Sequence, residues 1–97
     1  MLHQLALAHL NDALIDRIGV GDDVLLQYGT VWALLNGHAD NGKLLALQSK
    51  SCQLYALKAA LQVNGIEPER IIAGVQLIDY AEWVALTVKN PVIHTWN

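Results

Sequence analysis

Short, nearly continuous runs of apolar residues alternate along the chain with segments of helical character. Short apolar runs of this kind predict β-strands. The runs cover residues 2–8, 24–26, 51–57, 75–78 and 92–96. Continuous apolar runs are typical of strands buried on both faces, whereas a half-exposed sheet alternates apolar and polar positions. The pattern therefore predicts a mostly parallel sheet covered by helices.

The segments between these runs carry helix start and stop signals. Asp79 can cap a helix over residues 80–89, Glu82 completes a pattern close to a capping box, and Asn90-Pro91 ends this helix. The other predicted helices are one capped by Asn11 or Asp12 and ended by Gly19, one from a Thr30 cap through Val31 to Leu35, and short ones over residues 43–48 and 58–63. We expect a three-layer α/β/α sandwich around a five-stranded sheet.

The length and the charge content bound the organisation of the chain. Ninety-seven residues fit a single domain over residues 1–97. Charged residues make up only 15% of the chain and apolar residues 54%, against roughly 25% charged in typical proteins. A small domain has much surface, so sparse charge indicates that another chain covers part of it. We therefore expect an oligomer.

Several classes of function are excluded by the same features. The net charge is -3, and the six Lys and Arg residues are scattered, which argues against direct binding of nucleic acid. No apolar stretch approaches the ~18 residues of a membrane span. The first ten residues lack the pattern of a signal peptide, so we expect a cytoplasmic protein. The single cysteine excludes an internal disulfide and a Cys-rich zinc site.

No cofactor or metal site is predicted. The chain lacks the glycine-rich phosphate-binding motifs. Its histidines, His3, His9, His38 and His94, are widely separated, so we favour hydrogen-bonded histidines over a metal site, although His3 and His94 would meet if the first and last strands were neighbours. Asp79 follows a strand, where a functional carboxylate could lie, but a helix cap is the simpler interpretation. We expect no catalytic residue.

Cys52 is the candidate for sulfur chemistry. A persulfide-carrying cysteine needs a thiolate and therefore a nearby cation or helix N-terminus. Lys50 is close in sequence. Cys52, however, stands at the start of a predicted strand, whereas parallel sheets place reactive groups at the carboxyl ends of their strands. We therefore favour an inert packing role, and a sulfur carrier is the alternative.

Aromatic residues are few and are candidates for contacts with a partner, because tryptophan and tyrosine often anchor interfaces. Tyr28 and Trp32 fall near the second strand, and Trp96 is the penultimate residue. We expect these three to contribute to an interface. Trp83 is expected to pack on the sheet instead.

Segments spread over nearly the whole chain resemble the TusB/DsrH family. The most specific is residues 83–91, Trp-Val-Ala-Leu-Thr-Val-Lys-Asn-Pro, before Trp96. The others are Met1-Leu2-His3, residues 21–27, residues 54–57 with Gly65, and Ile78-Asp79-Tyr80. Their order and spacing carry the resemblance, because each piece alone is weak.

The resemblance implies a DsrEFH-like fold and a set of partners. TusB-like proteins assemble with TusC-like and TusD-like subunits into a heterohexamer. This complex takes persulfide sulfur from a TusA-like donor and passes it to a TusE-like carrier, for 2-thiolation of the wobble uridine in tRNA. The resemblance thus implies a non-catalytic subunit without a cofactor.

Departures from the family pattern favour its TusB side. Many members have Asp-Gly where this chain has Tyr28-Gly29, some DsrH members have a cysteine at the position of Leu14, and the relay cysteine of the TusD type has no counterpart. Three alternatives stay open: a DsrEFH-type subunit in oxidative sulfur metabolism, a persulfide-carrying sulfurtransferase that uses Cys52, and a free-standing domain that binds a small molecule.

Overall fold

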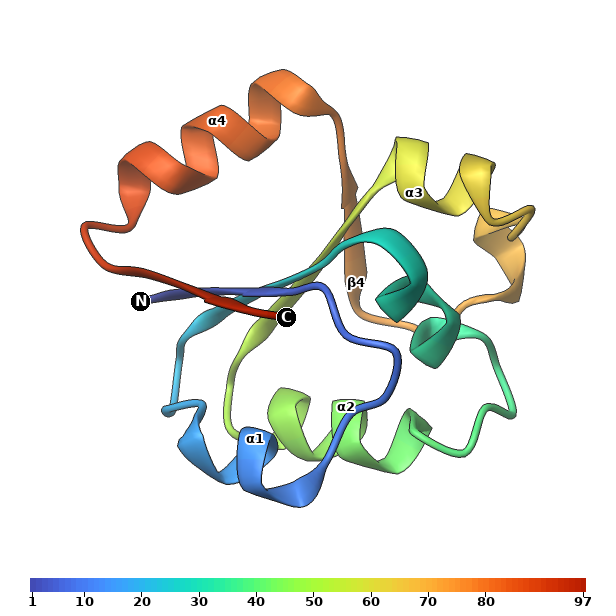
Figure 1. Cartoon of the computed structure of the whole chain (residues 1–97), viewed down its shortest axis with the longest axis horizontal. Helices are drawn as coiled ribbons and strands as arrows, with labels where there is room; N and C mark the ends of the chain where they lie inside the picture. The colour runs from blue at the N-terminus through green and yellow to red at the C-terminus, as the bar shows by residue number, and fades with distance from the viewer.

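The computed structural model describes residues 1–97, and its centre is a sheet of five strands (Figure 1). The strands are β1 (Leu2–Leu5), β2 (Asp23–Leu26), β3 (Gln53–Leu57), β4 (Val75–Ile78) and β5 (Ile93–Trp96). They lie in the order β4-β3-β2-β1-β5, and every neighbouring pair is parallel. The predicted α/β fold with a five-stranded sheet is therefore confirmed.

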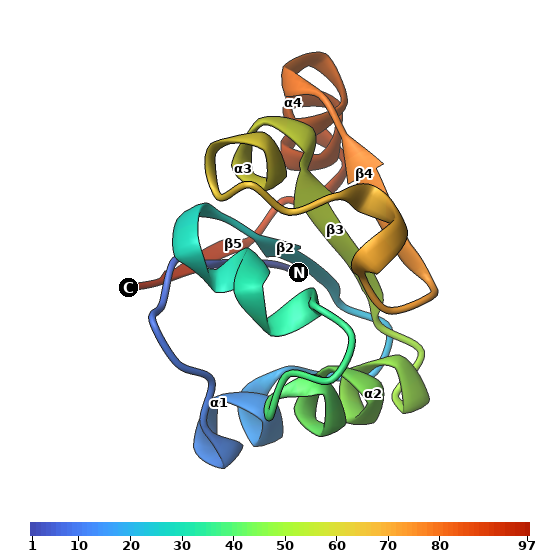
Figure 2. The same cartoon turned by 90° about the vertical axis from the view of Figure 1, so that its right-hand side faces the viewer.

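Helices cover both faces of this sheet (Figures 1 and 2). One face carries α1 (Asp12–Arg17), the 3-10 helix η1 (Tyr28–Leu34), α2 (Asn41–Ser49) and α3 (Lys58–Val63), which share the larger core. The other face carries α4 (Tyr80–Lys89), which packs on a smaller core. A short 3-10 helix, η2 (Pro68–Arg70), lies between α3 and β4. The arrangement is the expected three-layer sandwich.

Alternate side chains of each strand point to the two helical layers. On β1, Leu5 belongs to the larger core, whereas Leu2 packs with Leu25 of β2 and Leu86 of α4. All four residues of β2 are buried. Burial on both faces explains why these strands contain so few polar positions.

The direction in which the chain crosses the sheet decides where α4 lies. From β1 to β4, each connection leads to the adjacent strand, always in the same direction across the sheet. The connection after β4 returns across the sheet to β5, beside β1. Because crossovers between parallel strands are right-handed, this reversal puts α4 on the opposite face. Connections therefore leave β3 and β4 toward different faces, and such a point commonly opens a crevice at the carboxyl ends of the strands.

The prediction for the segment after β2 was wrong. Instead of an α-helix capped by Thr30, residues 28–34 form a 3-10 helix that begins at Tyr28. The Thr30 hydroxyl donates to the carbonyl of Leu7 at 2.7 Å and accepts from the Leu7 amide at 2.6 Å. A hydroxyl engaged with a distant part of the chain is not available as a cap. The chain also leaves β1 after Leu5, where a strand as far as Ala8 was predicted.

Local signals at other helix ends are confirmed. Asn11, rather than Asp12, caps α1 by accepting from the amide of Leu14. Asp79 accepts from the amide of Glu82, whose carboxylate accepts from the amide of Asp79, so the capping box is complete. None of the helices combines the length and the apolar character that crossing a bilayer requires.

Candidate functional site

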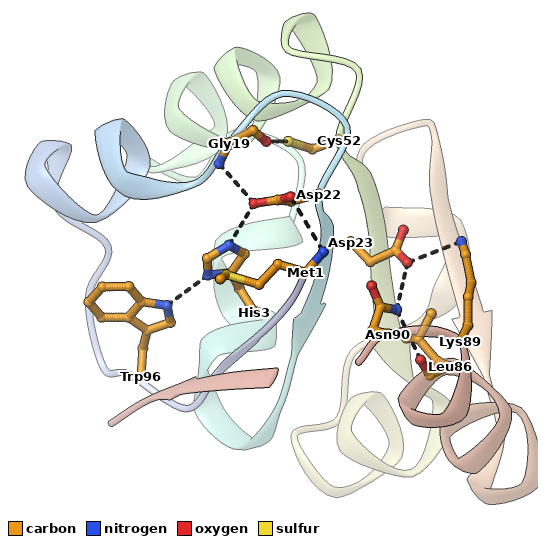
Figure 3. Close-up of polar contacts among 10 residues, drawn as sticks. All are labelled: Met1, His3, Gly19, Asp22, Asp23, Cys52, Leu86, Lys89, Asn90 and Trp96. Atoms are coloured by element: carbon orange, nitrogen blue, oxygen red, sulfur yellow. Dashed lines mark hydrogen bonds and ion pairs between the residues drawn. The ribbon is translucent and has the colours of Figure 1, made fainter. Parts of the chain in front are cut away.

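Cys52 lies immediately before β3, at the edge of the sheet where the strands begin (Figure 3). Only 6% of its surface is exposed, and its thiol donates to the carbonyl of Gly19 at 3.2 Å. Burial raises the pKa of this thiol, and the amides of Asp22 and Gly21 together with the charge of Lys50 do not offset it. The proton therefore stays on the sulfur, whereas persulfide chemistry needs the thiolate.

Lys50, the cation near Cys52 in sequence, has other partners. Its ammonium donates to the carbonyls of Ile15 and Ile18, at 2.9 and 3.2 Å, where α1 ends. Unpaired carbonyls at the end of a helix attract a cation in this way. The structure therefore uses Lys50 to fix α1 rather than to activate the thiol.

A polar cluster lies at the same edge of the sheet (Figure 3). Asp22 accepts from His3 Nε2 and from the Gly19 amide, at 2.9 Å each, and the Met1 ammonium lies 3.6 Å away. Burial favours the neutral acid, but the hydrogen bonds from His3 and Gly19 and the N-terminal charge outweigh it and lower the pKa of Asp22. His3 pairs in register with His94, because β1 and β5 are neighbours. No group of three or more His, Cys, Asp or Glu side chains is placed to hold a metal ion.

The neighbouring carboxylate, Asp23, is buried and joins the end of α4 to the start of β2 (Figure 3). It accepts from Lys89 at 3.1 Å and from Asn90 at 3.0 Å. Asn90 also donates to the carbonyl of Leu86 at 2.9 Å, within the last turn of α4. The Lys-Asn-Pro segment therefore anchors α4 to the sheet.

The opposite edge of the sheet, where the strands end, carries a pocket of about 220 Å³ between α3 and α4. Its walls are mostly apolar, and its only titratable side chain is a tyrosine. The lining residues are Gln27, Tyr28, Leu57, Ala59, Ala60, Val63, Asn64 and Trp83. Parallel sheets usually place reactive groups at this edge. Here no thiol, carboxylate, imidazole or amine lines the pocket, so it suits apolar contact rather than nucleophilic or acid–base chemistry.

Two of the aromatic residues predicted as partner contacts lie together beside this pocket. Tyr28 is 72% exposed, and Trp32 is 42% exposed. Asn64 links them, since it accepts from the Trp32 indole at 2.9 Å and donates to the Tyr28 carbonyl at 3.2 Å. Tyr28 has a left-handed backbone with φ 51°, which is uncommon for a bulky residue. This unusual conformation presents the phenol ring at the rim of the pocket.

Trp96, the third predicted contact, lies elsewhere, at the end of β5. Its indole donates to His3 Nδ1 at 3.1 Å, with the two ring planes 23° apart, and the ring of His94 lies 4.2 Å from the indole ring. It is half-buried and packs against the larger core. The structure therefore does not bring Trp96 together with Tyr28 and Trp32.

The outer side of α4 is an apolar surface that the sequence analysis missed. Tyr80, Val84 and Val88 follow one another at four-residue spacing, and all three are exposed. Trp83, on the inner flank, packs on the sheet as expected and donates to Gln4 at 2.9 Å. The available signal was the presence of apolar residues on every side of segment 80–89, which is typical of a helix covered all round.

The sequence and the fold were compared with those of known proteins. The sequence matches the family of DsrH-like proteins over residues 8–92. The chain belongs to this family. The membership confirms the resemblance expected from residues 83–91 and the other segments.

Similar proteins include several that are named Protein TusB. That of Pectobacterium parmentieri is 37% identical over 99% of this chain and 100% of the relative. That of Erwinia tasmaniensis is 32% identical over the same shares of both chains. That of Escherichia coli K12 is 34% identical over 87% of this chain and 84% of the relative. The similarity therefore extends over whole chains rather than a single motif.

Solved structures share the fold of this DsrH-like chain. The ychN protein of Escherichia coli superposes with a TM-score of 0.77 over 98% of this chain and 97% of its own, at 18% identity. The protein MTH1491 of Methanobacterium thermoautotrophicum gives a TM-score of 0.73 over 98% and 96%, at 15% identity. At such identities the likeness shows the fold alone.

Proposed function

We propose that this DsrH-like chain is a non-catalytic subunit of a TusBCD-like sulfur-relay complex in the cytoplasm. TusC-like and TusD-like subunits join it in a heterohexamer, which passes persulfide sulfur from a TusA-like donor to a TusE-like carrier. The sulfur then serves the 2-thiolation of the wobble uridine in tRNA. Whole-length similarity to proteins named TusB supports this proposal.

The position of the lone thiol is the observation that carries the non-catalytic role. Cys52 is buried at the amino edge of the sheet with a raised pKa. The carboxyl edge, where a relay cysteine would be exposed, has Leu57 at the end of β3 and an apolar pocket around it. A chain with this distribution contributes surface rather than sulfur chemistry.

Exposed apolar side chains support the role in assembly. They occur on α4 and beside the pocket at the carboxyl edge, as Tyr80, Val84, Val88, Tyr28, Trp32 and Val63. A chain with few charges gains most from burying such positions against partner subunits. We propose that both surfaces contact TusC-like or TusD-like subunits.

The test is sulfur transfer in a complex reconstituted from this chain and its TusC-like and TusD-like partners. With Cys52→Ser in this chain, we expect transfer to the TusE-like carrier to stay within about twofold of the unchanged complex. A matched serine substitution of the TusD-like relay cysteine should abolish it. Lost transfer from an intact Cys52→Ser complex, or an adduct of about 32 Da on Cys52 after exposure to the loaded donor, would identify a sulfur carrier instead.

Two further measurements address the remaining alternatives. Deletion of the gene should remove 2-thiouridine from tRNA, whereas lost sulfur oxidation with intact 2-thiouridine indicates a DsrEFH-type role. Gel filtration should show co-elution with the TusC-like and TusD-like chains. If the chain elutes as a monomer and binds neither of the other two chains, a free-standing binding domain would be favoured.

A further inference from the structure

His3 has a hydrogen-bond partner at each ring nitrogen, although only 2% of the residue is exposed. The indole N–H of Trp96 can only donate, so His3 Nδ1, 3.1 Å away, accepts from it. Asp22, whose pKa is lowered, is a carboxylate and only accepts, so His3 Nε2 carries the proton that it donates at 2.9 Å. The partners therefore specify a neutral imidazole with its proton on Nε2 (Figure 3).

Protonation of this ring would disrupt one of the two bonds. The second proton adds to Nδ1, which faces the indole of Trp96. Two donors would then point at each other, and the hydrogen bond would be lost. The bond to Asp22 survives, because the imidazolium still donates from Nε2. Of the two hydrogen bonds of the His3 ring, protonation therefore breaks only the one with Trp96.

We propose that His3 and Trp96 form a proton-sensitive latch on β5, closed when His3 is neutral and open when His3 is protonated. The proposal stands independently of the sulfur-relay function. Proton binding at a buried histidine that has one donor and one acceptor partner is a recognised way to bias a two-state element.

The charges near the buried imidazole come from several elements. Asp22, before β2, favours the imidazolium, and the Met1 ammonium, 3.6 Å from that carboxylate, opposes it. From β5, the His94 ring lies 6.4 Å from the imidazole and 4.2 Å from the Trp96 ring, so it also contacts the indole. From α1, the guanidinium of Arg17 lies 6.0 Å from the Trp96 ring centroid. The hydrogen bond between the indole and the imidazole depends on which of the two rings carries the proton at their contact.

β5 is suited to such control because it is an edge strand with little burial of its own. Ile93, His94 and Thr95 are exposed, and only Trp96 is partly covered. Apart from its ladder with β1 and the Trp96–His3 bond, the strand has one further side-chain bond to β1, from Gln4 to Thr95 at 3.2 Å. Opening of the latch therefore loosens the end of β5 and frees an apolar ring at the edge of the sheet.

The test is an NMR titration of the full ¹⁵N-labelled chain that follows the indole N–H groups and the histidine ring nitrogens. As His3 takes up its proton, the Trp96 indole signal should shift with the same midpoint, and its exchange with water should accelerate roughly fivefold or more. The indole of Trp32 donates to the uncharged side chain of Asn64, away from β5, and should not respond. A constant Trp96 signal during the His3 titration, or neutral His3 with its proton on Nδ1, overturns the proposal.

Two variants separate His3 from its neighbour. His94→Gln, at an exposed position, should retain the Trp96 transition, and its loss there would assign the effect to His94 and reject the latch. His3→Asn cannot take up a proton and should abolish the transition; persistence would also reject the latch. If His3→Asn fails to fold, the titrations of the unchanged chain and of His94→Gln decide the matter.

Discussion

The thiol of Cys52 donates to the Gly19 carbonyl at a site where burial disfavours the thiolate. The unfolded thiol ionises near its ordinary pKa of 9.0, whereas the pKa in the folded chain is higher. The folded state therefore binds this proton more tightly. Its contribution to the free energy of unfolding is complete below 9.0 and is lost as the pH rises through the higher folded value.

We therefore expect the urea midpoint of the chain to fall between about pH 8 and about pH 10.5. In Cys52→Ser the fall should be shallower, because serine does not ionise in this range. Equilibrium unfolding followed by tryptophan fluorescence measures both. Tyr55 has a pKa raised mainly by burial, so part of the slope persists in the variant. Identical slopes in the two proteins would show that the thiol is not linked to stability.

Protonation of Asp22 affects stability in the opposite sense to protonation of Cys52. Its lowered pKa means that its contribution to stability is present above the ordinary value of 3.8 and is lost as the pH falls through the lower folded value. At neutral pH, Asp22→Asn should reduce the free energy of unfolding by roughly 1–3 kcal/mol, because His3 and the Gly19 amide lose an anionic acceptor. Asp16→Asn, at an exposed position of α1, is the matched control. Equal losses in both variants would contradict the role assigned to the cluster.

At the scale of elements, the apolar runs of β1 and β2 predicted strands because these two are buried on both faces. The type of η1 could not be predicted in the same way, since Thr30 bonds to Leu7, 23 residues earlier. The cluster at the amino edge also depends on strand order: His3 meets Trp96 only because β5 lies beside β1. The local sequence pattern therefore predicts the strands, the helices and their caps, whereas the pairing of strands distant in the sequence decides which polar side chains meet.

Two glycines with similar backbones allow a test of how β4 is positioned. Gly65 and Gly74 both have positive φ, 70° and 84°. A Cβ at Gly74 would lie 2.7 Å from the amide nitrogen of Gln48, which donates to the Ala73 carbonyl, whereas nothing lies within 4 Å at Gly65. Gly65→Ala should cost about 1 kcal/mol for its backbone alone. Gly74→Ala should cost about 2–3 kcal/mol, because the Gln48 bond is lost as well.

Urea unfolding of the two variants measures this difference. Equal costs would mean that Gln48 moves aside freely and does not hold the start of β4. A larger cost at Gly65 would contradict the conformations described for both turns.

At the scale of the whole molecule, the apolar outer side of α4 is the most direct test of assembly. Val84→Glu with Val88→Glu should change the free energy of unfolding by only about 0.5 kcal/mol, because both side chains are exposed. The same pair should weaken association with the TusC-like and TusD-like chains by about tenfold or more, since burying unpaired carboxylates is costly.

Val20→Glu is the matched control for this surface. Val20 is another exposed valine, in the turn between α1 and β2. Analytical ultracentrifugation of the mixed chains should show normal assembly with Val20→Glu. Equal effects of the two sets of substitutions would show that α4 is not an interface.

The functional surfaces of the whole molecule were only partly predictable. Tyr28 and Trp32, two of the predicted interface anchors, are exposed beside the carboxyl edge, and their contact with a partner stays a prediction. The pocket next to them was not predicted, because its walls come from α3, from Trp83 of α4 and from the ends of β2 and β3. Only the reversal of direction after β4 brings these segments together.

The strand order also has a consequence for synthesis of the chain. β1, which leaves the ribosome before the other four strands of the sheet, borders β5, which leaves it after them. Until β5 has been synthesised, one side of β1 has unpaired amides and carbonyls, and His3 lacks its indole partner. An unpaired strand edge is prone to pair with other chains. A nascent chain of this fold therefore remains open to wrong pairing along this edge of β1 until β5 has emerged and covers it.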